Sequence, residues 1–170
     1  MERCEGCGFA WEEVAPAMIG QRVSKGVAAI TEALAGAGAS VVVQPVPGRW
    51  SAVEYAAHTR DVLLTIRDRL VIGIVEDEPS FTPMYREERV TLGLYHRDTA
   101  PAIADELTSA AAMFIRLFAA IPGDQLDRAV QYGTPTPTRR TLRWMAQQAV
   151  HEVEHHGADI AANLRPTTTP

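Results

Sequence analysis

The sequence lacks the features that mark membrane proteins and secreted proteins. No apolar run approaches the roughly 18 residues that a membrane-spanning helix needs. The first residues, Met1 to Glu5, are polar and acidic, whereas a secretory signal begins with a basic patch followed by an apolar stretch. We therefore expect a soluble, cytoplasmic protein without a membrane partner.

Positive charge is also in short supply. The chain has 16 Lys and Arg against 21 Asp and Glu, which gives a formal net charge of -5. The basic residues are scattered, nearly all are arginine, and they form no basic tail. Nucleic-acid-binding proteins usually concentrate such residues in a patch or stripe. The charge pattern therefore argues against nucleic acid as a partner.

Cysteine occurs only twice, at Cys4 and Cys7. Two cysteines do not make a disulfide framework, and in a reducing compartment a Cys-x-x-Cys pair more often binds metal or does redox work. The stretch CEGCGF at 4–9 resembles one knuckle of a zinc ribbon, but the second cysteine pair of a ribbon is missing. Closure around zinc would need histidines such as His96 or His156, or another subunit. A redox dithiol and a plain N-terminal turn are the alternatives.

What the chain does contain is an ordinary globular composition. Its 170 residues match one domain that can bury about two-thirds of its unfolded surface. The hydrophobic content of 46% and the charged content of 22% are typical of globular proteins. We therefore expect a hydrophobic core that does not depend on disulfides or a metal for its stability. We predict an N-terminal cysteine segment at 1–15, a helical domain at 16–165 and a tail at 166–170.

Helical periodicity and helix-capping residues define this domain. Apolar residues recur at spacings of three to five from Pro16 to about Ala37. Ser51 and Glu54 form the pattern of a capping box for a helix that reaches about Val75. Two further helices are expected, one opened by Asp98-Thr99-Ala100-Pro101 and stopped at Pro122-Gly123, the other running from Thr141 to Leu164.

The connecting segments contain no convincing strand. The residues around Val41-Val42-Val43 and those at 133–138 are predicted to be loops, because proline and glycine interrupt them. Segment 76–97 is expected to be irregular, with a short helical turn around Tyr85 to Leu94. Four helices with long connections between the first and second and between the second and third predict an all-α four-helix bundle.

The hexapeptide at 151–156, HEVEHH, lies within the last predicted helix. Residues four apart lie above one another on a helix, so His151 and His155 direct their imidazoles to one point. Neutral imidazole is a common ligand of zinc and nickel. His58 is the only histidine on a long predicted helix outside this C-terminal cluster, and a bundle can bring it to the pair. The predicted metal ligands are therefore His58, His151 and His155.

Carboxylates near these histidines support this interpretation, since ligating imidazoles usually donate their second N–H to such a group. Glu54 and Asp61 lie within helical reach of His58, and Glu154 and Asp159 lie near the pair. The alternative is that the histidines form a solvated polar stripe.

The pattern His151-Glu152-x-x-His155 also matches the zincin proteases. No glutamate or histidine after His156 could serve as their third ligand, Asp159 is too close, and no edge strand is predicted to hold a peptide. A protease is therefore disfavoured.

The stretch WSAVEYAAH at 50–58 resembles the start of the second helix in the DinB/YfiT-like superfamily, and His151-x-x-x-His155 resembles its last-helix motif. The superfamily includes mycothiol-dependent maleylpyruvate isomerases, and the resemblance spans about Ile19 to Leu164. It implies a four-helix bundle with long crossovers and a divalent metal, zinc or nickel, on His58, His151 and His155. The chain departs from the pattern at His156, whose role the resemblance leaves open.

Three function hypotheses follow from the residues and the resemblance. The first is a metal-dependent thiol S-transferase or isomerase, in which the metal lowers the pKa of a low-molecular-weight thiol and Glu54 or Asp61 orients a ligand or carries a proton. The second is a non-enzymatic metal-binding or stress-response bundle without a substrate pocket, and the third is a metal-dependent hydrolase. The expected partner is a small electrophilic substrate, and a homodimer is compatible with the sequence.

Overall fold

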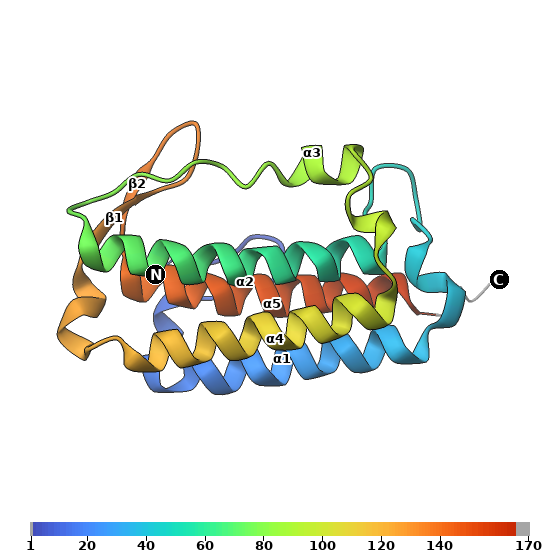
Figure 1. Cartoon of the computed structure of the whole chain (residues 1–170), viewed down its shortest axis with the longest axis horizontal. Coiled ribbons are helices and arrows are strands. Elements are labelled where there is room, and N and C mark those ends of the chain that lie inside the picture. Colours follow the sequence, from blue (N-terminus) through green and yellow to red (C-terminus); the bar gives the residue numbers. More distant parts are fainter. Residues whose placement is uncertain (1, 166–170) are drawn as a thin grey trace.

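Four long helices form the body of the molecule in a computed structural model, which describes residues 2–165. These helices are α1 (Pro16–Gly36), α2 (Ala52–Val75), α4 (Ala100–Ala120) and α5 (Leu142–Asn163), arranged as a bundle (Figure 1). The predicted all-α four-helix class is therefore confirmed. The predicted tail at 166–170 lies outside the described residues.

The order of the helices in the bundle explains the long connections. Both α1 and α2 pack against α4 and α5 but make few contacts with each other, so they lie diagonally opposite. Helices α2 and α4 run in the same direction, and segment 76–99 returns along the length of α2 before α4 begins (Figure 1). This returning segment, called the crossover below, contains the short helix α3 (Arg86–Thr91) and a 3-10 turn at Tyr95–Arg97.

The predicted helix starts are confirmed by their caps. The Ser51 backbone N–H donates to Glu54 Oε2 at 2.7 Å and the Ser51 hydroxyl accepts from the Glu54 backbone N–H at 3.3 Å, which completes the capping box. The hydroxyls of Thr99 and Thr141 accept from backbone N–H groups at the starts of α4 and α5.

One element was missed by the sequence prediction. Strands β1 (Ala129–Tyr132) and β2 (Thr138–Thr141) pair antiparallel, with Tyr132 opposite Thr138. The expectation of loop structure without a strand was wrong here, because four-residue strands are too short to show a period-two pattern. The hairpin contacts the crossover, where the Gln131 backbone N–H donates to Pro79 O at 2.9 Å.

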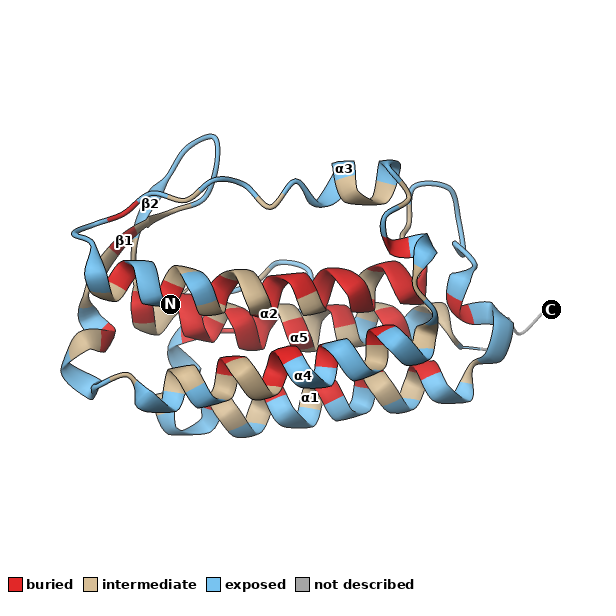
Figure 2. Ribbon diagram, in the orientation of Figure 1, coloured by how far each residue is buried: buried red, intermediate tan, exposed pale blue. Residues whose placement is uncertain are grey.

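The core lies between the long helices and is mainly apolar, with most of the buried residues of α2 and α5 facing it (Figure 2). Seven buried polar or charged side chains interrupt this core on the same two helices: Glu54, His58, Thr59, Asp61, Gln147, His151 and His156. Buried polar groups are costly unless partners satisfy them, so these residues direct attention to one region. No helix within residues 2–165 is both long and apolar enough to cross a membrane.

Candidate metal centres

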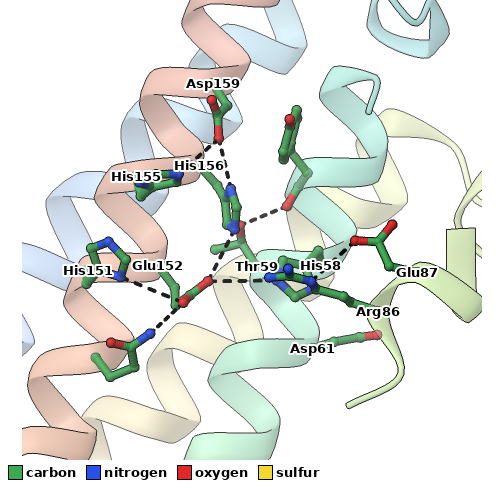
Figure 3. A network of polar contacts seen from close by, with 12 residues as sticks. His58, Thr59, Asp61, Arg86, Glu87, His151, Glu152, His155, His156 and Asp159 are labelled. Atoms are coloured by element: carbon green, nitrogen blue, oxygen red, sulfur yellow. Dashed lines mark hydrogen bonds and ion pairs between the residues drawn. The ribbon is translucent and has the colours of Figure 1, made fainter. Parts of the chain in front are cut away.

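Glu152 lies at the middle of the buried histidines (Figure 3). Its Oε2 is 3.2 Å from His156 Nε2 and 3.8 Å from His58 Nε2. His58, Glu152 and His156 each offer one ligand atom, and these three atoms lie within 4.8 Å of one another. We call these three residues the Glu152 centre.

Helix geometry accounts for this set. Glu152 and His156 are four residues apart on α5 and therefore lie on one face, while His58 reaches them from α2, which packs against α5. The pair at 152 and 156 differs from the predicted pair at 151 and 155 by one residue, which is about 100° of helix rotation. Both pairs have the same spacing in the sequence. The pair at 152 and 156 is less conspicuous as a metal-binding pattern, because one of its members is a glutamate.

The charge states in the Glu152 centre suit a divalent cation. Burial lowers the pKa of His58, which keeps the ring neutral near pH 7, and its Nδ1 has no hydrogen-bond partner within residues 2–165. Burial opposes ionisation of Glu152, but the surrounding imidazoles of His151, His156 and His58 outweigh it and hold its pKa well below the usual range. Two imidazoles and a carboxylate are a donor set that zinc accepts in open, catalytic sites.

His156 has the second contact that ligating histidines usually make. Its Nδ1 lies 3.1 Å from Asp159 Oδ2, which turns Nε2 toward Glu152. Burial disfavours the protonated ring, but hydrogen bonds to Asp159 and Glu152 raise the pKa of His156 to about 8. A metal ion bound here would therefore replace a proton on this ring.

The other two predicted ligands lie in a different group. His151 and His155 face Cys4 and Cys7, and the ligand atoms of these four residues also lie within 4.8 Å of one another. We call them the Cys–His group. The structure thus places His58 in one candidate metal group and His151 and His155 in another.

The two predicted catalytic carboxylates hold the crossover against α2. Glu54 accepts from Gln44 at 3.1 Å and is paired with His96 at 2.8 Å. Asp61 accepts from Arg89 Nη1 at 2.5 Å and from the Tyr95 hydroxyl at 3.0 Å. Neither carboxylate is part of the Glu152 centre or of the Cys–His group.

A cavity of about 520 Å³ opens beside the Glu152 centre, and both His58 and Glu152 lie in its wall. The crossover and the hairpin supply most of the remaining wall, including Phe81, Met84, Arg86 and Tyr132. Of these lining residues only His58 was singled out by the sequence. The others lie on segments whose position depends on the fold of the crossover.

The profile of the DinB superfamily matches residues 22–160. The chain belongs to the DinB superfamily. This confirms the family resemblance drawn from the residues at 50–58 and from the last-helix histidines. No curated protein matches the chain.

Two solved structures are similar to this DinB-superfamily chain. Bacillus subtilis YfiT, described as a probable metal-dependent hydrolase with an unusual four-helix bundle topology, has a TM-score of 0.80 at 16% identity, covering 96% of this chain and 91% of YfiT. A conserved Enterococcus faecalis protein has a TM-score of 0.63 at 17% identity, covering 88% of this chain and 94% of its own. At these identities the similarity shows the fold alone.

Proposed function

We propose that this chain is a divalent-metal-dependent enzyme that joins a low-molecular-weight thiol to a small electrophile, as a thiol S-transferase or a thiol-dependent isomerase. The observation that carries the proposal is the cavity, because two of the three residues of the Glu152 centre form part of its wall. A non-enzymatic metal-binding bundle would need no such space beside its metal. Membership in the DinB superfamily and the likeness to YfiT add support for a metal.

His58, Glu152 and His156 are the residues that would hold the ion, in place of the predicted His58, His151 and His155. The unpartnered Nδ1 of buried His58 and the ionised Glu152 fit this role. When bound, a divalent ion would supply a Lewis acid that lowers the pKa of a thiol or water molecule. Gln148 Nε2 donates to Glu152 Oε1 at 2.6 Å and so fixes the orientation of the carboxylate.

The wall of the cavity suits a small molecule with an apolar part and a negative charge. The Arg69 guanidinium lies 5.1 Å from the ring centroid of Phe81 and 5.5 Å from that of Tyr132, and it donates to the Thr82 carbonyl oxygen. Arginine held between aromatic rings is well placed to bind a carboxylate. Arg69 and Arg86 both line the cavity, and the aromatic rings offer contact to an apolar group.

A thiol nucleophile would come from outside the protein. The residues described in the cavity wall include no cysteine and no serine. A thiol small enough to enter would supply the nucleophile, and Glu87 and Glu88 are carboxylates of the wall that can accept its proton. They replace Glu54 and Asp61 in this role, because those two side chains are engaged in holding the crossover.

A metal-dependent hydrolase is the second candidate, favoured by the description of YfiT. The same cavity would then admit water as the nucleophile.

The test is a turnover assay on purified protein with an activated aromatic halide or a maleyl-type acid, with and without a cellular thiol and with and without metal. Consumption that needs both the thiol and the metal supports thiol transfer or isomerisation. Turnover that needs metal but no thiol supports the hydrolase. No metal-dependent turnover of any substrate in a panel would favour the non-enzymatic bundle. Glu152→Gln is the matched inactive variant, because it keeps the shape of the side chain and removes its charge.

A further inference from the structure

The N-terminal segment folds back onto α5 and brings both cysteines of the chain to two of its histidines. Cys4 Sγ lies 3.9 Å from His155 Nδ1, and the ligand atoms of Cys4, Cys7, His151 and His155 all lie within 4.8 Å of one another. Two thiols and two imidazoles on two separate segments thus converge on one point. The Glu152 centre uses none of these four residues.

We propose that Cys4, Cys7, His151 and His155 form a second metal site, a closed structural zinc site with two sulfur and two nitrogen ligands. Four protein ligands leave no open position, which is the property that separates structural zinc sites from catalytic ones. The site would fasten the N-terminal segment to α5. It shares no ligand with the Glu152 centre, to which the proposed reaction belongs.

The spacing of the side chains fits this ion. Zn–S bonds of about 2.3 Å and Zn–N bonds of about 2.0–2.1 Å in a tetrahedron separate sulfur from nitrogen by roughly 3.5 Å. The distance of 3.9 Å between Cys4 Sγ and His155 Nδ1 is within a few tenths of an ångström of that value. Small rotations of the side chains would therefore complete the site.

Both histidines have one ring nitrogen near a carboxylate. His155 faces Cys4 with Nδ1, and its Nε2 lies 3.6 Å from Asp159 Oδ2. His151 Nδ1 lies 3.7 Å from Glu152 Oε1, and neither of its buried ring nitrogens has a hydrogen-bond partner among the residues described. Carboxylates beside the second nitrogen are typical of zinc-bound histidines, because they fix the ring orientation.

The backbone of the N-terminal turn is shaped to bring the sulfurs together. The Cys4 backbone N–H donates to Phe9 O and the Gly8 backbone N–H donates to Cys4 O, both at 2.8 Å, and Gly8 has φ +74°. A Cβ at Gly6 would lie 3.2 Å from His155 Cε1, so the turn passes close to the imidazole.

The surroundings also suit a structural ion. Phe9 and Trp11 are buried and pack against the His151 ring, with centroid distances of 5.2 Å and 4.9 Å. On the other side a cavity of about 350 Å³ reaches Cys7 and His155, which provides a path for the ion to enter.

The test uses cobalt(II), because cobalt bound to thiolate gives a sulfur-to-metal charge-transfer band that nitrogen and oxygen ligands cannot give. Reduced, metal-free protein is titrated with cobalt(II) under anaerobic conditions, and zinc bound by the purified protein is measured separately. We expect a thiolate charge-transfer band with tetrahedral ligand-field bands. In Glu152→Gln, where the Glu152 centre is disabled, the band should saturate at one cobalt per chain and be lost on addition of one equivalent of zinc. Absence of the thiolate band in the reduced parent protein overturns the proposal, whatever metal the Glu152 centre binds.

Variants assign the ligands. Cys4→Ser and Cys7→Ser should each abolish the thiolate band or weaken cobalt binding at least tenfold, and His155→Ala should do the same. Glu152→Gln and His58→Ala should keep the band. His96→Ala is the matched histidine control, because His96 is half exposed and belongs to neither group. Retention of the full band in His155→Ala, with helical circular dichroism unchanged, would also refute the site.

Discussion

Among single residues, His156 separates the two ligand sets most clearly. The sequence assigned His58, His151 and His155 to one ion, whereas the structure surrounds Glu152 with His58 and His156. We expect His156→Ala to lose the metal of the Glu152 centre, as His58→Ala does, because each removes a nitrogen ligand from a three-residue set. Elemental analysis after removal of the Cys–His group by Cys4→Ser and Cys7→Ser measures this metal alone.

The opposite outcome would support the ligand set predicted from the sequence. If His156→Ala in that background keeps the full metal content while His151→Ala loses it, the ligand set predicted from the sequence is correct. His96→Ala serves again as the control for loss of an unrelated histidine.

Glu54 provides the second residue-level prediction, which concerns pH. Burial raises the pKa of Glu54, but hydrogen bonds from the Ser51 backbone, Gln44 and the Ser51 hydroxyl, with the charge of His96, outweigh it and leave the pKa below 4.5. A carboxyl group whose pKa is lowered by folding stabilises the protein above its unfolded pKa, and this contribution is lost as the pH falls through the folded pKa. Glu54 therefore stabilises the fold at neutral pH.

Glu54→Gln should lower the free energy of unfolding by about 1–2 kcal/mol at pH 7, the usual scale for a charged hydrogen-bonded cap. The difference between parent and variant should shrink as the pH falls below 4.5, because the parent carboxyl then becomes neutral as well. Urea unfolding at a series of pH values measures it. A difference that stays constant down to the acid limit would show that the charge of Glu54 does not stabilise the fold.

Among the secondary-structure elements, α2 holds the crossover that forms much of the cavity wall. Asp61 accepts hydrogen bonds from Arg89 of α3 and from Tyr95, both within the crossover, while Arg69 donates to Thr82. The sequence suggested a catalytic role for Asp61 because it lies within helical reach of His58, whereas in the structure Asp61 bonds to the crossover. The residue types fit either role, and only the fold shows which partners they meet.

Asp61→Asn should loosen the crossover and leave the metal of the Glu152 centre in place. The substitution removes the charge that pairs with Arg89 and Arg60, so amide hydrogen exchange at residues 80–97 should rise. Metal content should stay at the parent level. Unchanged exchange together with a large fall in turnover would instead support the catalytic role predicted for Asp61. Asp68→Asn on the same helix, an exposed position, is the matched control.

The long helices and their caps could be predicted from the sequence because they depend on local signals, such as Ser51 with Glu54 and the apolar spacing from Pro16. The hairpin could not, since its strands are stabilised by pairing and by contact with Pro79 of the crossover. The choice between residues 151/155 and 152/156 as ligands has no local signal either. It depends on which side of α5 meets His58 and which meets Cys4.

At the scale of the whole molecule, α5 contributes residues to both proposed metal sites, and Glu152 contacts residues of each. Its Oε1 faces His151 of the Cys–His group and its Oε2 faces His58 and His156. A zinc ion in the Cys–His group would therefore fix the ring of His151 and, through it, one side of the carboxylate. The N-terminal segment would act as a support for the Glu152 centre.

The last prediction is that zinc bound in the Cys–His group stabilises the fold independently of the Glu152 centre. An ion that binds only the folded chain contributes about 2.7 kcal/mol at a concentration 100 times its dissociation constant, which for a chain of this size corresponds to roughly 5–10 °C in Tm. Glu152→Gln, which disables the Glu152 centre, should keep a zinc-dependent rise in Tm of this size. Adding Cys4→Ser and Cys7→Ser to that variant should remove it. A rise that survives without both cysteines would place the stabilising ion elsewhere, and scanning calorimetry over a series of buffered zinc concentrations distinguishes the two outcomes.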